Sequence, residues 1–269
     1  MKNKVVVITG AAGVICSTIA EHFAKLGSKV AMLDLNYEMA KKYEDDFNSR
    51  GLISKAYKCN VLDRENIEKV YESIKKDFGE VDILINGAGG NNPKATCDQE
   101  IYDINNSGTS FFDLDPKGIS FVFDLNILGT ILPTQVIAKD MREGCSVINI
   151  SSMNAFTPLT KIVAYSGAKA SVNNFTQWLA VHLAKVGVRC NAIAPGFLVT
   201  NQNKGLLFNE DGTPTARTKK ILTNTPMDRF GEPSEMLGAI EFLVDNKKAS
   251  FITGVIIPID GGFNAYSGV

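Results

Sequence analysis

Short apolar runs alternate with longer amphipathic stretches along the whole chain, and this alternation constrains the fold more than any other feature. Most runs are four to six residues long and rich in valine and isoleucine, which is typical of strands buried on both faces of a sheet. The stretches between them carry apolar residues three and four positions apart, as at Ile67, Val70 and Ile74, which predicts helices. The alternation predicts an α/β fold, a doubly wound parallel sheet with helices on both faces. The expected strands are residues 5–8, 29–33, 53–57, 81–85, 146–150, 188–193 and 255–259.

The chain is predicted to form one domain over residues 1–269. Folds of the α/β class with about 250 residues commonly form a single domain, and no repeat or linker interrupts the pattern. Two segments, at about 87–118 and 200–231, lack clear periodicity. Irregular segments of this length in a compact domain are usually functional or mobile, so we expect them to serve as substrate loops.

Charge and cysteine usage exclude several classes of function. The net charge of −1 leaves no basic excess for nucleic acid or for an anionic membrane surface. Five scattered cysteines without a CxxC pair, and only two histidines, argue against a metal site or a disulfide framework and favour a reducing compartment. The first apolar run is too short for a signal peptide, and no run of 18 apolar residues is present, so we expect a cytoplasmic protein.

A glycine-containing turn, Thr9-Gly-Ala-Ala-Gly13, follows the first predicted strand and precedes a helical pattern. Such a turn lets backbone amides approach a pyrophosphate at a helix N-terminus, although glycine alone is equally consistent with a plain turn. Asp34 ends the second run, where a carboxylate can bind an adenosine ribose; a helix cap or a solvated turn residue is the alternative. Leu35 and Asn36 follow it and supply no cation for a 2′-phosphate, which favours NAD over NADP.

Tyr165 and Lys169 are four residues apart at the start of a long helical pattern, so they share a helix face. At about 4 Å and an effective dielectric constant of about 20, the ammonium stabilises a phenolate by at most about 4 kcal/mol, or about three pKa units. Taken alone, the pair is more typical of a solvated face. Ser152 closes a predicted strand, where its hydroxyl can polarise a substrate carbonyl or simply cap a turn. Asn126 occupies a mid-helix position, where asparagine is unfavourable, and this indicates a polar function such as holding a water molecule in a proton relay. The alternative is that Asn126 caps a helix or lies on the surface.

Together these residues resemble the short-chain dehydrogenase/reductase family over essentially the whole chain. Asn126, Ser152, Tyr165 and Lys169 look like its catalytic tetrad, Asn86-Gly-Ala-Gly89 is similar to its N-N-A-G motif, and Pro195-Gly196 with Thr200 to its P-G-x-x-x-T segment. Thr253-Gly254 and Asp260-Gly-Gly262 match its C-terminal signature, and Asn60-Val61 stands where the family contacts adenine. The resemblance implies a Rossmann-type fold, NAD as cofactor, and a homotetramer with residues 116–142 and 165–186 at interfaces. The cofactor-binding residues that it implies are Thr9, Gly10, Gly13, Val14, Ile15, Asp34, Leu35, Asn60, Val61, Asn86, Gly87, Ala88, Tyr165, Lys169, Pro195, Gly196, Leu198 and Thr200.

Two motifs depart from the family pattern. The family turn reads T-G-x-x-x-G-x-G, but Val14 and Cys16 occupy its last two glycine positions and Gly13 is offset by one. Gly87 replaces the second asparagine of N-N-A-G. The loop geometry near the pyrophosphate is therefore open, and Cys16 is interpreted as a small structural cysteine rather than a redox group.

A narrower resemblance to bacterial D-mannonate oxidoreductases (fructuronate reductases) lies in residues 87–96, 111–116, 152–158 and 260–269. It implies reversible reduction of D-fructuronate by NADH to D-mannonate. A gluconate dehydrogenase or another polyol or sugar-acid dehydrogenase is the alternative, and a non-catalytic dinucleotide sensor is disfavoured by the complete tetrad. Amides suit sugar hydroxyls and a cation suits a carboxylate, for which Lys94 is favoured ahead of Lys161 and Arg217. The predicted substrate-binding residues are Asn91, Asn92, Lys94, Ser152, Asn154 and Gln202.

Overall fold

A computed structural model describes residues 1–200 and 204–268. Its centre is a seven-stranded parallel sheet, as the alternation of runs predicts, and its strand order is β3-β2-β1-β4-β5-β6-β7. The strand order reverses direction between β1 and β4, and ligands of open α/β sheets bind beyond the carboxyl ends of the strands at such a point. The strands are β1 (Val5–Thr9), β2 (Lys29–Asp34), β3 (Ile53–Lys58), β4 (Ile83–Asn86), β5 (Ser146–Ile150), β6 (Arg189–Pro195) and β7 (Ile256–Ile259).

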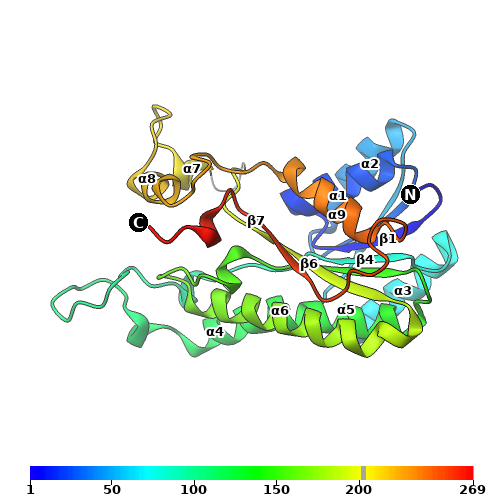
Figure 1. The fold of residues 1–269 in the computed structure, drawn as a ribbon, viewed down its shortest axis with the longest axis horizontal. Coiled ribbons are helices and arrows are strands. Elements are labelled where there is room, and N and C mark those ends of the chain that lie inside the picture. Colours follow the sequence, from blue (N-terminus) through cyan, green and yellow to red (C-terminus); the bar gives the residue numbers. More distant parts are fainter. Residues whose placement is uncertain (201–203, 269) are drawn as a thin grey trace.

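Helices cover both faces of the sheet, with α1, α2 and α9 on one side and α3 to α6 on the other (Figure 1). The pleat of β1 shows why this central strand is almost entirely apolar: Ile8 packs in the core with Ile19 and Phe23 of α1, and Val7 packs in the core with Ile74 of α3. The helices are α1 (Val14–Lys25), α2 (Tyr37–Ser49), α3 (Arg64–Phe78), α4 (Pro116–Phe123), α5 (Gly129–Ile137), α6 (Val163–Leu183), α7 (Lys204–Leu207), α8 (Ala216–Thr223) and α9 (Leu237–Val244).

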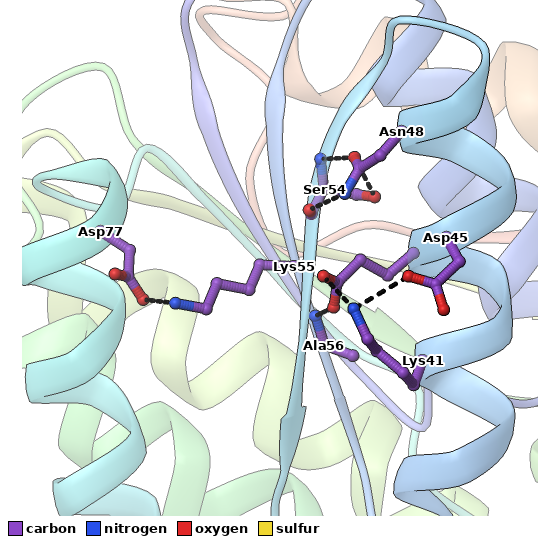
Figure 2. A network of polar contacts seen from close by, with 8 residues as sticks. Lys41, Asp45, Asn48, Ser54, Lys55, Ala56 and Asp77 are labelled. Atoms are coloured by element: carbon purple, nitrogen blue, oxygen red, sulfur yellow. Dashed lines mark hydrogen bonds and ion pairs between the residues drawn. The ribbon is translucent and has the colours of Figure 1, made fainter.

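The free edge of β3 is closed by side chains of α2 (Figure 2). Asn48 pairs with Ser54 through both its amide oxygen, which accepts from the Ser54 N–H at 3.0 Å, and its Nδ2, which donates to the Ser54 carbonyl at 3.1 Å. The Glu44 carboxylate accepts from the Ala56 N–H at 2.7 Å. These side chains bond the outward-facing backbone groups of β3, which is an edge strand of the sheet. The strand is therefore poorly suited to pair with a strand of another chain.

One helical stretch, Pro116–Asp140, is long and apolar enough to cross a membrane by length and composition alone. It consists of α4, the π-helical turn η3 (Asp124–Leu128), α5 and the short η4 (Ala138–Asp140). Half of it is buried, and its side chains at Val136 and Ile137 belong to the core beneath the sheet. A core helix satisfies the same test, and the packing assigns this stretch to the core.

Both irregular segments lie beyond the carboxyl ends of the strands (Figure 1). The first holds only the short 3-10 turns η1 (Pro93–Ala95) and η2 (Phe111–Asp113) before α4 begins. The second is more regular than its sequence predicts, because α7 and α8 form within it. The Thr215 hydroxyl caps α8 by accepting from the Thr218 N–H at 3.3 Å, which starts a helix too short to show a clear apolar period.

Candidate active site

A cavity of about 370 Å³ opens at the carboxyl end of β1, between β1 and β4 at the switch in strand order. The N-terminus of α1 lines it at Val14 and Ile15, and the N-cap is Gly13, which provides no capping side chain. The first-turn amides of a helix have no intrahelical partner, and they carry partial positive charge. The cavity therefore fits an anionic pyrophosphate at this end.

Gly10 is required at the base of the turn for two independent reasons. Its φ of +68° is a conformation that side-chain-bearing residues rarely adopt. A Cβ there would also lie 2.8 Å from the backbone nitrogen of Ala88, where the turn touches the end of β4. The Thr9 hydroxyl holds the same contact by accepting from the N–H groups of Gly87 and Ala88, at 3.1 and 3.2 Å.

The two departures from the family pattern occupy one place in the structure. A Cβ built on Gly87 would overlap the Sγ of Cys16. The thiol on α1 therefore fills the space that a side chain at position 87 would need, and the glycine at 87 makes room for it. The turn thus keeps its contact with the end of β4 although Cys16 stands where the family has glycine. Burial raises the pKa of the Cys16 thiol to about 12, so it is neutral and suits a packing role.

Asp34, the last residue of β2, also lines the cavity, and it braces the glycine turn. Its carboxylate accepts from the Ala12 N–H at 2.9 Å and from the Asn36 N–H at 2.7 Å. It is the one charged side chain among the described residues that line this cavity. A ribose diol can donate to such a carboxylate, whereas a 2′-phosphate would meet a negative charge without a cation.

Most of the predicted cofactor residues line this cavity, and several others do not. Those that line it are Gly10, Gly13, Val14, Ile15, Asp34, Leu35, Asn60, Val61, Gly87, Ala88 and Thr200. Those placed outside its lining are Thr9, Asn86, Tyr165, Lys169, Pro195, Gly196 and Leu198. The lining residues that the sequence analysis does not predict are Cys16, Leu33, Cys59, Gly89 and Leu125, each of them within a residue or two of a predicted one.

Ser152 and Tyr165 bring two hydroxyl groups together at the carboxyl edge of the sheet. Ser152 follows β5 and is buried, and its Oγ accepts from the Asn154 N–H at 3.2 Å. Tyr165 lies in the first turn of α6. Burial raises the pKa of the Tyr165 phenol, and a hydrogen bond with Ser152 opposes that rise. The phenol is therefore protonated at neutral pH, in the form that donates a proton.

The ammonium of Lys169 does not lower the pKa of Tyr165 in the way that the spacing alone predicts. Its Nζ lies 5.7 Å from the centre of the Tyr165 ring and donates to the Ile150 carbonyl at 2.8 Å. Burial lowers the pKa of Lys169 to about 8, because the charged form loses its hydration. The helix places both groups in one site, but burial and the hydrogen bond with Ser152, not the charge of Lys169, shift the pKa of the phenol.

Asn126 is fully buried in the π-helical turn η3. Its Oδ1 accepts from the Gly90 N–H at 3.2 Å, and its Nδ2 donates to the carbonyls of Gly90 and Val122, each at 2.7 Å. A Cβ at Gly89 would lie 2.7 Å from this Oδ1 and 3.1 Å from the Nζ of Lys169. Asn126 thus holds the 89–90 backbone against Lys169, and the bonds explain an asparagine in mid-helix.

The predicted substrate residues fall into three places. Asn154 is buried beside Ser152, and its Oδ1 has no partner among the described residues, which leaves an acceptor for a substrate hydroxyl. Asn91 and Asn92 are engaged locally, with the Thr96 hydroxyl at 2.9 Å and the Lys94 N–H at 2.9 Å. Lys94 is exposed and lies 3.5 Å from the Asp115 carboxylate. Gln202 lies outside the described residues.

A parallel sheet with an uncapped helix N-terminus, a carboxylate at the end of β2 and a paired serine and tyrosine is typical of a dinucleotide-binding oxidoreductase. A family model described as enoyl-(acyl carrier protein) reductase matches residues 10–264. An uncharacterized oxidoreductase of Haemophilus influenzae is 61% identical over 273 residues, with 100% of this chain and 96% of the relative covered. The uncharacterized oxidoreductase UxuB of Bacillus subtilis is 48% identical over 271 residues, with 100% and 98% covered.

The fold is also that of a crystal structure from Haemophilus influenzae that has bound NAD and the provisional name D-mannonate oxidoreductase. The two agree with a TM-score of 0.97 at 61% identity, over 100% of this chain and 98% of the other. The chain belongs to the short-chain dehydrogenase/reductase family, and it is an oxidoreductase.

Proposed function

We propose that this protein is an NAD-dependent reductase of keto sugar acids, with D-fructuronate and D-mannonate as its substrate pair. The observation that carries the proposal is the pairing of the Ser152 and Tyr165 hydroxyls beside buried Lys169, at the same sheet edge as the dinucleotide cavity. The Haemophilus influenzae structure with its bound NAD and its name supports both the cofactor and the substrate.

The charges of the cavity residues determine which part of NAD each of them binds. The α1 amides bind the pyrophosphate, and Asp34 binds the adenosine ribose. NAD supplies the hydride acceptor and, once reduced, the hydride donor. Lys169 binds the nicotinamide ribose, by analogy with the family; its ammonium has three N–H donors, and one of them already bonds the Ile150 carbonyl.

Side chains of the protein deliver the proton that the ketone oxygen of the substrate takes up. The Ser152 hydroxyl donates to the ketone oxygen of the substrate, and Tyr165 delivers a proton to that oxygen as the alcohol forms. The raised pKa of Tyr165 keeps this proton in place at neutral pH, which favours the reductive direction. Asn126 positions the backbone at Gly90 beside Lys169, and a water there continues the proton path to solvent.

The polar lining of the substrate side supports a hydroxylated acid over a steroid or acyl chain, which would need apolar walls. The buried amide oxygen of Asn154 beside Ser152, which has no hydrogen-bond partner among the described residues, supports a polar ligand at this place. We also propose that the protein is cytoplasmic and that it forms a homo-oligomer. The oligomer is supported by α6, a helix expected at an interface, which exposes Trp178 and Val181 with 57% and 79% of their surfaces accessible.

A substrate panel tests the proposal. Purified protein is mixed with NADH or NADPH and with D-fructuronate, and with NAD and either D-mannonate or D-gluconate, while the NADH absorbance band is followed. We expect rapid oxidation of NADH by D-fructuronate and little reaction with NADPH. Preference for D-gluconate would favour the alternative dehydrogenase, and tight NADH binding without turnover of any substrate would favour a sensor.

A further inference from the structure

A second cavity, of about 350 Å³, lies between the segment that leads into α6 and the helix α8. Three cationic side chains and one carboxylate line it, namely Lys161, Arg217, Lys220 and Glu100. Its remaining walls include the apolar side chains of Phe197 and Ile162. A site that combines apolar walls with a few charged groups is typical of small-molecule binding.

The charges in this cavity do not cancel. Lys220 places its Nζ 2.7 Å from the Glu100 carboxylate, and this contact lowers the pKa of Glu100. Among the described residues, the side chains of Lys161 and Arg217 form no ion pair or hydrogen bond. The cavity therefore presents two cations that are free to bind an anion.

The cavity lies close to the proposed reaction centre. Lys161 and Ile162 directly precede α6, whose third residue is Tyr165. The Lys161 carbonyl accepts from the Cys97 N–H at 2.8 Å, which fixes this segment against the first irregular loop. Phe197 follows the end of β6 by two residues, at the same edge of the sheet. A sugar acid joins its carboxylate to its ketone through a short chain of hydroxylated carbons, so a single substrate suits two neighbouring places of this kind.

Lys94 occupies a cavity of the opposite sign. The space of about 680 Å³ around it is also lined by Asp98, Asp113 and Asp115. Lys94 is partnered by Asp115, and hydrogen bonds from the backbone and from Ser110 lower the pKa of Asp115 and Asp113 respectively, so both stay ionised. Three carboxylates around one ammonium repel an anionic substrate.

We propose that Lys161 and Arg217, rather than Lys94, bind the carboxylate of the substrate and set the preference for sugar acids over neutral ketoses. The assignment rests on the proposed function and names the substrate-recognising residues of that site. The guanidinium of Arg217 offers paired donors that match a carboxylate, and the Lys161 ammonium adds a second charge.

Three single variants, Lys161→Met, Arg217→Met and Lys94→Met, test the assignment. Each removes one charge and keeps most of the side-chain volume, and Lys94→Met is the matched control. The substrates are D-fructuronate and D-fructose, which carries a hydroxymethyl group in place of the carboxylate. Steady-state kinetics with NADH give kcat and KM, or an inhibition constant for D-fructose where it is not reduced.

Loss of either cation should raise KM for D-fructuronate about 10- to 100-fold, because a hydrogen bond to a charged group is lost. Binding of D-fructose should change less than about twofold, and Lys94→Met should leave both substrates within about twofold. Equal losses for both substrates, or a selective loss in Lys94→Met alone, would overturn the assignment and leave the acid reductase intact. A wild-type protein that reduces D-fructose in preference to D-fructuronate would instead overturn the proposed function.

Discussion

The substitution Gly87→Ala tests whether Cys16 and Gly87 share one packing volume. The new Cβ would overlap the Cys16 Sγ and lie 2.9 Å from the Thr9 carbonyl oxygen. Overpacking of this kind costs about 1–3 kcal/mol of unfolding free energy. Cys16→Ala removes the sulfur and alone costs about 1 kcal/mol through the lost burial. In the double variant the new methyl group at position 87 occupies the space of the missing sulfur, so we expect a favourable coupling of about 1–2 kcal/mol, with the Thr9 contact left as a residual cost.

Equilibrium urea unfolding followed by circular dichroism measures the four free energies of this cycle. Gly90→Ala is the matched control on the same segment, because the nearest atom to its new Cβ is Leu125 Cδ2 at an ordinary 3.7 Å. We expect the control to change stability by less than about 0.5 kcal/mol. If the effects of Gly87→Ala and Cys16→Ala simply add, the two positions do not compensate each other and the packing explanation fails.

Three further predictions concern the charged and titrating groups. Asp34→Asn should weaken NAD binding by about tenfold or more and relax the discrimination against NADP, because the ribose loses a charged acceptor. Titration of both cofactors measures the two affinities, and an unchanged preference for NAD would place the ribose elsewhere. Lys169→Met should abolish turnover yet leave the folded protein equally stable, or up to about 2 kcal/mol more stable, at pH 7. Burial lowers the pKa of Lys169 from 10.5 to about 8, so the buried ammonium costs about 3 kcal/mol of folding free energy at that pH. Loss of the hydrogen bond to the Ile150 carbonyl offsets part of the gain from its removal. That gain should shrink as the pH rises from about 8 toward 10.5, and unfolding curves that show no such pH dependence would contradict the burial argument. With the pKa of Tyr165 raised, ketone reduction should be nearly constant across neutral pH while alcohol oxidation rises with pH, and a flat oxidation profile would argue against the phenol as the base.

The sheet and the position of the site follow from the sequence because their causes are local. A strand buried on both faces is mostly apolar, so the seven apolar runs mark the seven strands to within one or two residues of their ends. Parallel pairing then brings the residues after β1, β2, β4 and β5 to a single edge, which is why Gly10, Asp34, Gly87 and Ser152 could be assigned to one site.

The rest of the site depends on contacts between distant parts of the chain. The Cys16 side chain fills the space beside Gly87, although the two residues are far apart in the sequence. The rise in the pKa of Tyr165 comes from burial by the fold, opposed by a hydrogen bond with Ser152, and neither is visible in the spacing to Lys169. The proposal that moves the carboxylate site from Lys94 likewise rests on a contact that the sequence does not show, because Asp115 of a later segment lies 3.5 Å from the Lys94 ammonium.

Transfer of deuterium tests the central claim most directly. NADH deuterated at the transferable position of nicotinamide C4 is incubated with D-fructuronate and either the wild-type protein or Tyr165→Phe, and the product is examined by mass spectrometry. The account predicts D-mannonate with one deuterium on the new alcohol carbon from the wild-type protein, and intact NADH binding without product from Tyr165→Phe. Product without deuterium, or undiminished turnover by Tyr165→Phe, would contradict it.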